Sequence, residues 1–221
     1  MGHDREALME TSVGRLLVLA GPLLWALLVL FHSSPAGASE YEGIANEVDR
    51  WLLVHVGQLV LTPFVLFAVW RLLDGLSSVA AMVGRGALIV WTVFFSAYDS
   101  IQGVATGTLA RYANGLAGEE QNAVAGAIEY VVRDDRLGGN ISVIGFLGQG
   151  SWIVVAIAAA VALHRVGAGK AVVAATCLSV LFAIHTAPAA AGLLALFLAI
   201  VLRERQRTKS AVRAPAVTSG R

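Results

Sequence analysis

Charged side chains are scarce in this chain of 221 residues. Asp, Glu, Lys and Arg make up 14% of it, against about 25% in a typical soluble domain. Hydrophobic residues make up 57%, and the mean hydropathy is +0.72. Because so much apolar surface is accommodated only in lipid, we expect the lipid bilayer as a partner. The net charge is only +1, and no nucleic-acid-binding motif or clustered basic face is present, so no nucleic acid is expected.

Cysteine and compact catalytic motifs are also scarce. The one cysteine, Cys177, lies in an apolar run, cannot form an intrachain disulfide, and is expected to be a small buried hydrophobic residue. There is no H-E-x-x-H metalloprotease motif and no phosphate-binding G-x-x-x-x-G-K-[ST] loop. No nucleophile elbow or Ser-His-Asp order is readable. The sequence therefore assigns no activity from a linear motif.

Long apolar runs are what the chain does have. A bilayer core of roughly 30 Å needs about 20 helical residues. Six stretches approach this length: about 14–32, 51–71, 86–108, 141–163, 171–186 and 188–203. Between the last two lies the sequence H-T-A-P ending at Pro188, and proline disfavours helix at the residue before it. We interpret it as a tight turn between two short helices; the alternative is one long kinked helix, which gives five spans.

The distribution of basic residues favours six spans. Twelve of the 16 Lys and Arg residues lie in four segments, which are 1–15, 71–85, 164–170 and 203–221. The other four are Arg50, Arg111, Arg133 and Arg136. Positively charged loops stay in the cytoplasm, and six spans place every rich segment there. Five spans would put the basic C-terminal tail outside.

The expected fold is therefore all-α: a multi-pass transmembrane helical bundle of about six helices in the plasma membrane, with both termini cytoplasmic. We expect residues 1–205 to form a single integral membrane domain. Residues 206–221, rich in Arg, Lys, Ser, Ala and Pro, are predicted to be a disordered basic cytoplasmic tail. The start of the chain also resembles a signal peptide, with an A-G-A cleavage pattern at 36–38. Because the leading segment is long and acidic in part, we expect residues 1–38 to be retained.

A polar stretch on the outer side, about 117–136, is predicted to form an amphipathic helix. Its apolar residues share one side of the helix: Val124, Ile128, Val131 and Val132. Two interpretations are open. The helix lies on the membrane surface, or it is a lid over a cavity that faces outward.

Polar residues inside the spans point to a candidate site, because such residues usually face the bundle interior. The third span carries five small or polar residues at steps of four, three, four and three, which share one face: Thr92, Ser96, Asp99, Gly103 and Thr106. Asp99 lies about two thirds of the way across. A lone carboxylate at that depth is expected to be neutral or paired.

Histidines gather in the same layer under the six-span topology. The second span carries His55, Gln58 and Thr62 on one face, spaced by three and four. His32 ends the first span, and His185 lies in the turn between the last two spans. Gln149 on the fourth span completes a candidate pocket lining with Gln58 and Thr62.

Four interpretations of this layer are open. The polar residues serve as non-catalytic hydrogen bonds between helices or serve a partner, which is slightly favoured. Alternatively, His32, His55, Asp99 and His185 bind a divalent metal such as zinc, in a hydrolase acting on a lipid-like substrate from the outer leaflet. Haem on His55 and His185 is a further possibility, and so is a proton or solute relay through Asp99 and His55.

The candidate catalytic residues are Asp99, His55 and Ser96. Alkaline ceramidases and progestin-receptor-like membrane hydrolases also combine Ser, Asp and His on helices, and Ser96 with Asp99 is similar to part of that set. The paired histidines of that pattern are missing from the last span, where spans five and six hold only His185. The chain is therefore not assigned to that family.

Overall fold

The protein is all-helical in the computed structural model, which describes residues 19–32, 39–139, 142–184 and 187–213 and has no strand in these ranges. Three helices are long and apolar enough to cross a membrane: Val48–Leu72, Val79–Ala113 and Val143–Arg165. Two shorter apolar helices are Leu19–Val29, here called the first helix, and Lys170–Ala183. This composition is compatible with a membrane protein.

The long helices follow the predicted spans closely. Helix α3 (Val48–Leu72) contains the second predicted span, and α7 (Val143–Arg165) nearly matches the fourth. The third predicted span, about 86–108, lies within a longer continuous stretch. That stretch consists of α4 (Val79–Asp99), the π-helix η1 (Ser100–Ala105) and α5 (Thr106–Ala113). At 1.5 Å per residue its 35 residues extend about 52 Å, well beyond a bilayer core of roughly 30 Å.

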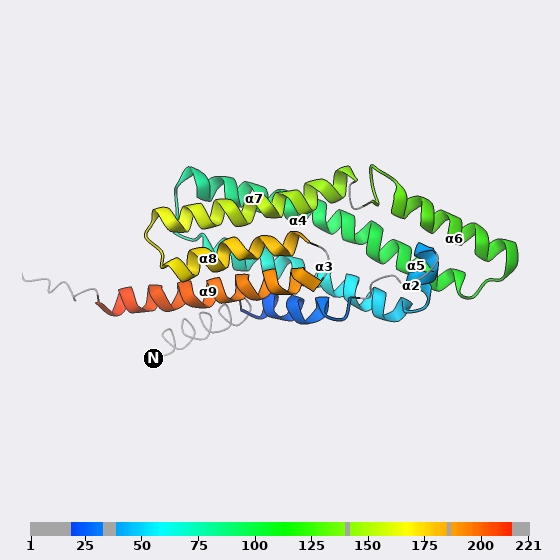
Figure 1. Cartoon of the computed structure of the whole chain (residues 1–221), viewed down its shortest axis with the longest axis horizontal. Coiled ribbons are helices and arrows are strands. Elements are labelled where there is room, and N and C mark those ends of the chain that lie inside the picture. Colours follow the sequence, from blue (N-terminus) through cyan, green and yellow to red (C-terminus); the bar gives the residue numbers. More distant parts are fainter. Residues whose placement is uncertain (1–18, 33–38, 140–141, 185–186, 214–221) are drawn as a thin grey trace, which may run out of the picture.

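The helices lie along one long axis, and the two ends of the molecule differ (Figure 1). At one end, α5 gathers with α2 (Glu40–Ala45) and α6 (Gly118–Arg133), and we call these three helices the cap. At the other end lie the α3–α4 turn, the α7–α8 turn and the C-terminal end of α9 (Ala187–Arg213), which we call the turn end. The candidate site lies between the two.

The last two predicted spans are separate helices that pack on each other. Helix α8 (Lys170–Leu178) tightens into the 3-10 helix η2 (Ser179–Ala183), and α9 packs against both. Gly192 allows this approach, because a Cβ there would overlap the backbone of Phe182. Among the described residues, η2 and α9 are thus two separate packed helices, with Ala187 and Pro188 in the first turn of α9, and residues 185–186 lie outside the described ranges. Cys177 on α8 is exposed, so the expectation that it is buried was wrong.

An aromatic cluster fills the middle of the bundle. It comprises Trp25, Trp91, Phe95, Trp152 and Phe182, all buried. Phe182 lies 4.8 Å from Trp152 and 5.0 Å from Trp25 between ring centroids, both edge to face. The Trp152 indole also donates to the Ser179 carbonyl at 2.8 Å. The cluster therefore joins the first helix, α4, α7 and the α8–η2 hairpin arm through one set of rings.

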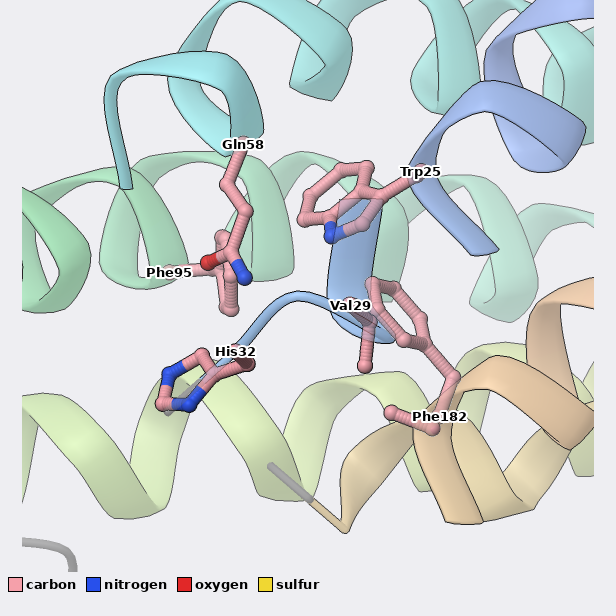
Figure 2. A pocket seen from close by; sticks show the side chains of 7 residues that line it. Trp25, Val29, His32, Gln58, Phe95 and Phe182 are labelled. Atoms are coloured by element: carbon pink, nitrogen blue, oxygen red, sulfur yellow. The ribbon is translucent and has the colours of Figure 1, made fainter. Parts of the chain in front are cut away.

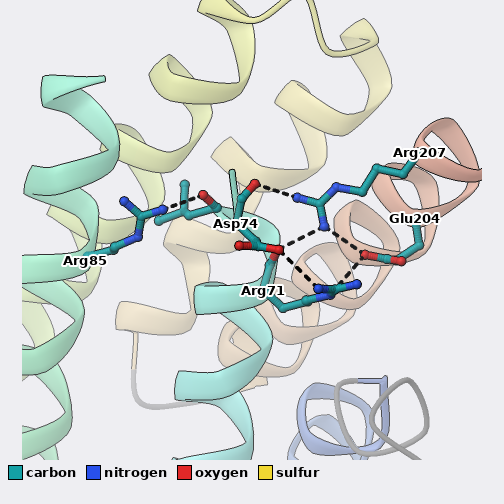
Figure 3. Close-up of polar contacts among 6 residues, drawn as sticks. Arg71, Asp74, Arg85, Glu204 and Arg207 are labelled. Atoms are coloured by element: carbon teal, nitrogen blue, oxygen red, sulfur yellow. Dashed lines mark hydrogen bonds and ion pairs between the residues drawn. The ribbon is translucent and has the colours of Figure 1, made fainter. Parts of the chain in front are cut away.

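Arginines fix the turn end (Figure 3). Arg85 donates to the carbonyls of Leu73 (2.7 Å) and Leu76 (3.0 Å) in the α3–α4 turn. From α9, Arg207 donates to the carbonyl of Asp74 at 2.8 Å and contacts Glu204 at 3.1 Å. Such contacts explain why α9 continues through Arg213, whereas the sequence predicted a disordered tail from residue 206. Residues 214–221 of that tail lie outside the described ranges.

A second small core holds the cap together. Ile128 and Val132 of α6 are buried against Ile44 of α2 and Ala110 of α5. Helix α6 lies within the stretch 117–136 and buries two of its apolar residues. Outside this core, the Tyr41 hydroxyl donates to the Asn114 side chain at 3.0 Å. The cap is thus a packed unit, and α6 is part of it.

Candidate functional site

A π-helix begins directly after Asp99, where η1 interrupts the long α4–α5 stretch. Such π-turns break the regular hydrogen-bond ladder and often occur at functional sites. The Gly103 carbonyl in η1 accepts a hydrogen bond from the Trp51 indole of α3 at 2.8 Å. The Thr106 hydroxyl donates to the Gln102 carbonyl. Side chains thus satisfy backbone groups of the irregular turn and fix it beside α3.

His55 and Asp99 form a buried pair at this level. The Nδ1 atom of His55 and the Oδ1 atom of Asp99 lie 2.7 Å apart, within hydrogen-bond distance. The side chains are 2% and 0% exposed, respectively. One proton on either atom makes the bond, so the two groups share it. The second carboxyl oxygen, Oδ2, is buried and has no hydrogen-bond partner among the described residues.

The His55 ring is closely packed on two sides. It packs directly on Gly103, where a Cβ would overlap the ring. Trp51 covers it at 4.4 Å between ring centroids, and His32 lies 5.1 Å away, edge to face. Glycine at position 103 thus allows the imidazole to reach Asp99. We call His32, His55, Gln58 and Asp99 the polar layer.

A small cavity adjoins the polar layer (Figure 2). Its lining residues are Trp25, Val29, His32, Gln58, Phe95, Phe182 and Ala189. It has room for about one water-sized molecule. Trp25 and Gln58 are buried, and neither the Trp25 indole nitrogen nor the Gln58 amide oxygen has a hydrogen-bond partner among the described residues. Two polar groups therefore face a cavity that the imidazole-bearing His32 also lines and whose remaining lining residues are apolar.

The predicted site residues are brought together only in part. His32, His55 and Asp99 gather in the polar layer, and Gln58 lines the cavity. Thr62 is buried one turn further along α3, where its hydroxyl donates to the Gln58 carbonyl at 2.9 Å. It is not among the side chains that line the cavity.

Two other predicted residues, Ser96 and Gln149, are not among the described residues that line this cavity. Ser96 lies half-buried on α4, three residues before Asp99. Gln149 lies on α7 with its amide nitrogen buried and without a described hydrogen-bond partner. His185 lies outside the described residues, so its predicted part in a metal or haem site stays a prediction.

The pairing of His55 with Asp99 changes the role expected of Asp99 among the predicted metal ligands. Among the described residues, no group of three or more His, Cys, Asp or Glu side chains is arranged to hold a metal ion. Asp99 contacts Nδ1 of His55. In metal proteins such a carboxylate orients the histidine rather than binding the ion. Asp99 is therefore better placed to orient His55 than to ligate.

Aromatic residues at the site were not predicted. Trp51 of α3 packs against the His55 ring and donates to the Gly103 carbonyl of η1. Trp25, Phe95 and Phe182 line the cavity without any signal in the local sequence. The spacing of Trp51 and His55 by four residues, one helical turn, is the signal that could have joined them.

Comparison of the chain with protein-family models, with curated proteins and with solved structures finds no match. Function is therefore inferred from the chemistry of the polar layer and its surroundings.

Proposed function

We propose that the protein is a multi-pass plasma-membrane protein with six membrane-embedded helical segments and both termini in the cytoplasm, and that its polar layer binds a proton from the outer side. The positively charged residues support this orientation, since Arg71, Arg85 and Arg207 meet at the turn end (Figure 3). The cap carries acidic residues in the first turns of α2 and α6. In this orientation the cap lies outside the cell.

The observation that carries the proposal is the 2.7 Å contact between His55 Nδ1 and Asp99 Oδ1. An imidazole and a carboxyl group in direct contact form a site that gains or loses a proton as a unit. Both side chains lie inside candidate membrane spans, where ionisable residues usually serve a function. Gly103 and Trp51 hold the ring in place, as a site with a fixed geometry requires.

The side chains on the cytoplasmic side of the polar layer favour proton binding without transfer of the proton across the membrane. Phe95 and Trp91 precede Asp99 on α4 by four and eight residues, so they lie between the polar layer and the turn end. They belong to the buried aromatic cluster, which offers no polar route. The cavity has room for about one water-sized molecule, too little for a lipid-like substrate. These features support a non-catalytic, proton-responsive role.

Infrared difference spectroscopy tests the proposal, because protonated and ionised carboxyl groups absorb at separate frequencies. We expect the difference between pH 5 and pH 8 to contain a carboxyl band and an imidazole band that both disappear in Asp99→Asn. Asp74→Asn, at the exposed turn end, is the matched control and should leave both bands in place. An unchanged difference spectrum in Asp99→Asn would refute proton binding by the pair. A proton flux into vesicles that Asp99→Asn abolishes would support passage instead.

A metal site is the second candidate, favoured by the two neighbouring histidines. The ring centroids of His32 and His55 lie 5.1 Å apart, and Asp99 orients His55 as such carboxylates do in zinc proteins. Metal analysis of detergent-purified protein decides this. Zinc near one per chain in the wild type, and less in Asp99→Ala, would support it. Background levels of zinc, copper and iron in both would exclude a bound metal, and a spectrum without a Soret band would exclude haem.

The proposed topology is tested separately by cysteine labelling on a Cys177→Ser background. Single cysteines in the 164–170 loop should react with a membrane-impermeant maleimide only after the cytoplasmic side is opened. Single cysteines in the cap should react in intact cells. Labelling of the 164–170 loop from outside would overturn the orientation and the outward access of the polar layer.

A further inference from the structure

We propose that the cavity beside the polar layer is a hydration site, which binds a single water molecule through Trp25 and Gln58. The site lies where the first helix, α3 and the hairpin of η2 and α9 meet. It rests on the side chains that line the cavity and is independent of the proposed proton-binding function.

Two unpaired polar atoms carry the inference. Trp25 is 0% exposed and Gln58 is 1% exposed. The Trp25 indole Nε1 and the Gln58 amide Oε1 both lack a hydrogen-bond partner among the described residues. A buried donor or acceptor without a partner is destabilising, because it gives up its bonds to solvent and gains none. Here a donor and an acceptor in this state line the same cavity.

The chemistry of the pair fits water in particular. In Figure 2 the indole nitrogen of Trp25 and the amide nitrogen of Gln58 face the space between the two side chains, and the amide oxygen of Gln58 lies on the far side of the amide group. A water molecule there accepts from the indole N–H, and it either accepts from the amide nitrogen or donates to the amide oxygen. Because water both donates and accepts, it serves either orientation of Gln58.

The size and the remaining walls also favour water. The cavity has room for about one water-sized molecule, and a buried water needs two to four polar partners. His32 also lines the cavity, and Val29, Phe95, Phe182 and Ala189 close the remaining sides with apolar surface. Among the described residues that line the cavity there is no carboxylate, lysine or arginine, and His32 is the one ionisable side chain.

Water-edited solid-state NMR of the full-length protein, labelled with 15N tryptophan in bilayers, tests the site. Magnetisation that starts on water should reach the Trp25 indole N–H early, with the peak assigned by its loss in Trp25→Phe. Trp152 is the internal control: it is equally buried, but it donates to the Ser179 carbonyl. Its indole should receive no early transfer. This comparison is made within one wild-type sample and depends on no variant being folded.

Gln58→Leu supplies the second arm, because it removes the amide and keeps a side chain of similar size. The early transfer to Trp25 should fall several-fold in this variant while the Trp152 signal stays unchanged. Two results would overturn the inference. One is a Trp25 build-up as slow as that of Trp152 in the wild type. The other is a direct hydrogen bond from the Trp25 indole to the Gln58 amide, seen as a through-space contact without water transfer.

Discussion

Substituting Gly103 by alanine should disrupt the polar layer although no ionisable residue is replaced. A Cβ at position 103 would overlap the Cβ, Cγ and Nδ1 atoms of His55. The overlapped Nδ1 is the atom that contacts Asp99. To relieve the overlap, either η1 moves away from α3 or the His55 ring leaves Asp99. The first movement would also strain the hydrogen bond from Trp51 to the Gly103 carbonyl.

The expected loss of stability follows from these contacts. Overpacking of a well-packed interior costs roughly 1–3 kcal/mol, and loss of a hydrogen bond to a charged group costs roughly 1.5–3 kcal/mol. Alanine returns about 0.5–1 kcal/mol because it favours helix over glycine. Gly103→Ala should therefore lower the free energy of unfolding by roughly 2–5 kcal/mol.

Unfolding by SDS in mixed micelles, followed by tryptophan fluorescence, measures this loss. Gly86→Ala is the matched control, since Gly86 lies on α4 in the same long helical stretch and a Cβ there meets nothing within 4 Å. It should leave stability unchanged or raise it slightly. Equal stability of Gly103→Ala and Gly86→Ala would refute the close packing of His55 on Gly103 of η1. It would also refute the argument that position 103 requires glycine for this packing.

Three further predictions concern other parts of the molecule. His55→Gln and Asp99→Asn should be non-additive in the free energy of unfolding, with a coupling of roughly 1.5–3 kcal/mol in a double-mutant cycle, because each removes the same bond. Arg207→Gln should cost about 0.5–1.5 kcal/mol, since it loses bonds to carbonyls of the α3–α4 turn; SDS unfolding measures it. Ile128→Ala should destabilise the cap by roughly 2–5 kcal/mol, seen as faster hydrogen exchange in α6 with the rest of the bundle unchanged.

Each of these has a result that contradicts it. Additive effects at His55 and Asp99 would mean that the two side chains do not interact. Unaltered stability in Arg207→Gln would show that the Arg207 hydrogen bonds do not hold the end of α9, in line with the disordered tail that the sequence predicted. Uniformly faster exchange throughout the bundle in Ile128→Ala would show that the cap is no separate packed unit.

Much of the helical arrangement could be predicted because apolar length and periodicity are local properties. The runs over 51–71 and 141–163 are observed as α3 and α7. The apolar side of 117–136 is buried at Ile128 and Val132. The gathering of His32, His55 and Asp99 followed from topology, since loop charge set the direction of each span.

Other features depended on contacts that the sequence does not express. The π-helix after Asp99 adds a residue to one turn, and no residue type between Ser100 and Ala105 specifies it. The approach of Trp51 to the Gly103 carbonyl follows from that turn. Likewise, α9 continues past residue 206 because Arg207 binds the α3–α4 turn, a contact between residues more than 130 positions apart. Composition alone had favoured disorder there.

The central claim is that His55 and Asp99 form a hydrogen-bonded pair inside the membrane, and a solid-state NMR distance measurement tests it most directly. In bilayers, dipolar recoupling between 15N-labelled histidine and 13C-labelled aspartate reports the separation of His55 Nδ1 from the Asp99 carboxyl carbon. We predict strong dephasing of the His55 Nδ1 signal, consistent with the direct 2.7 Å contact between Nδ1 and Oδ1, and its loss in Asp99→Asn prepared with the same labels. A His55 signal that shows no dephasing in the wild type, or keeps it in Asp99→Asn, would contradict the pair.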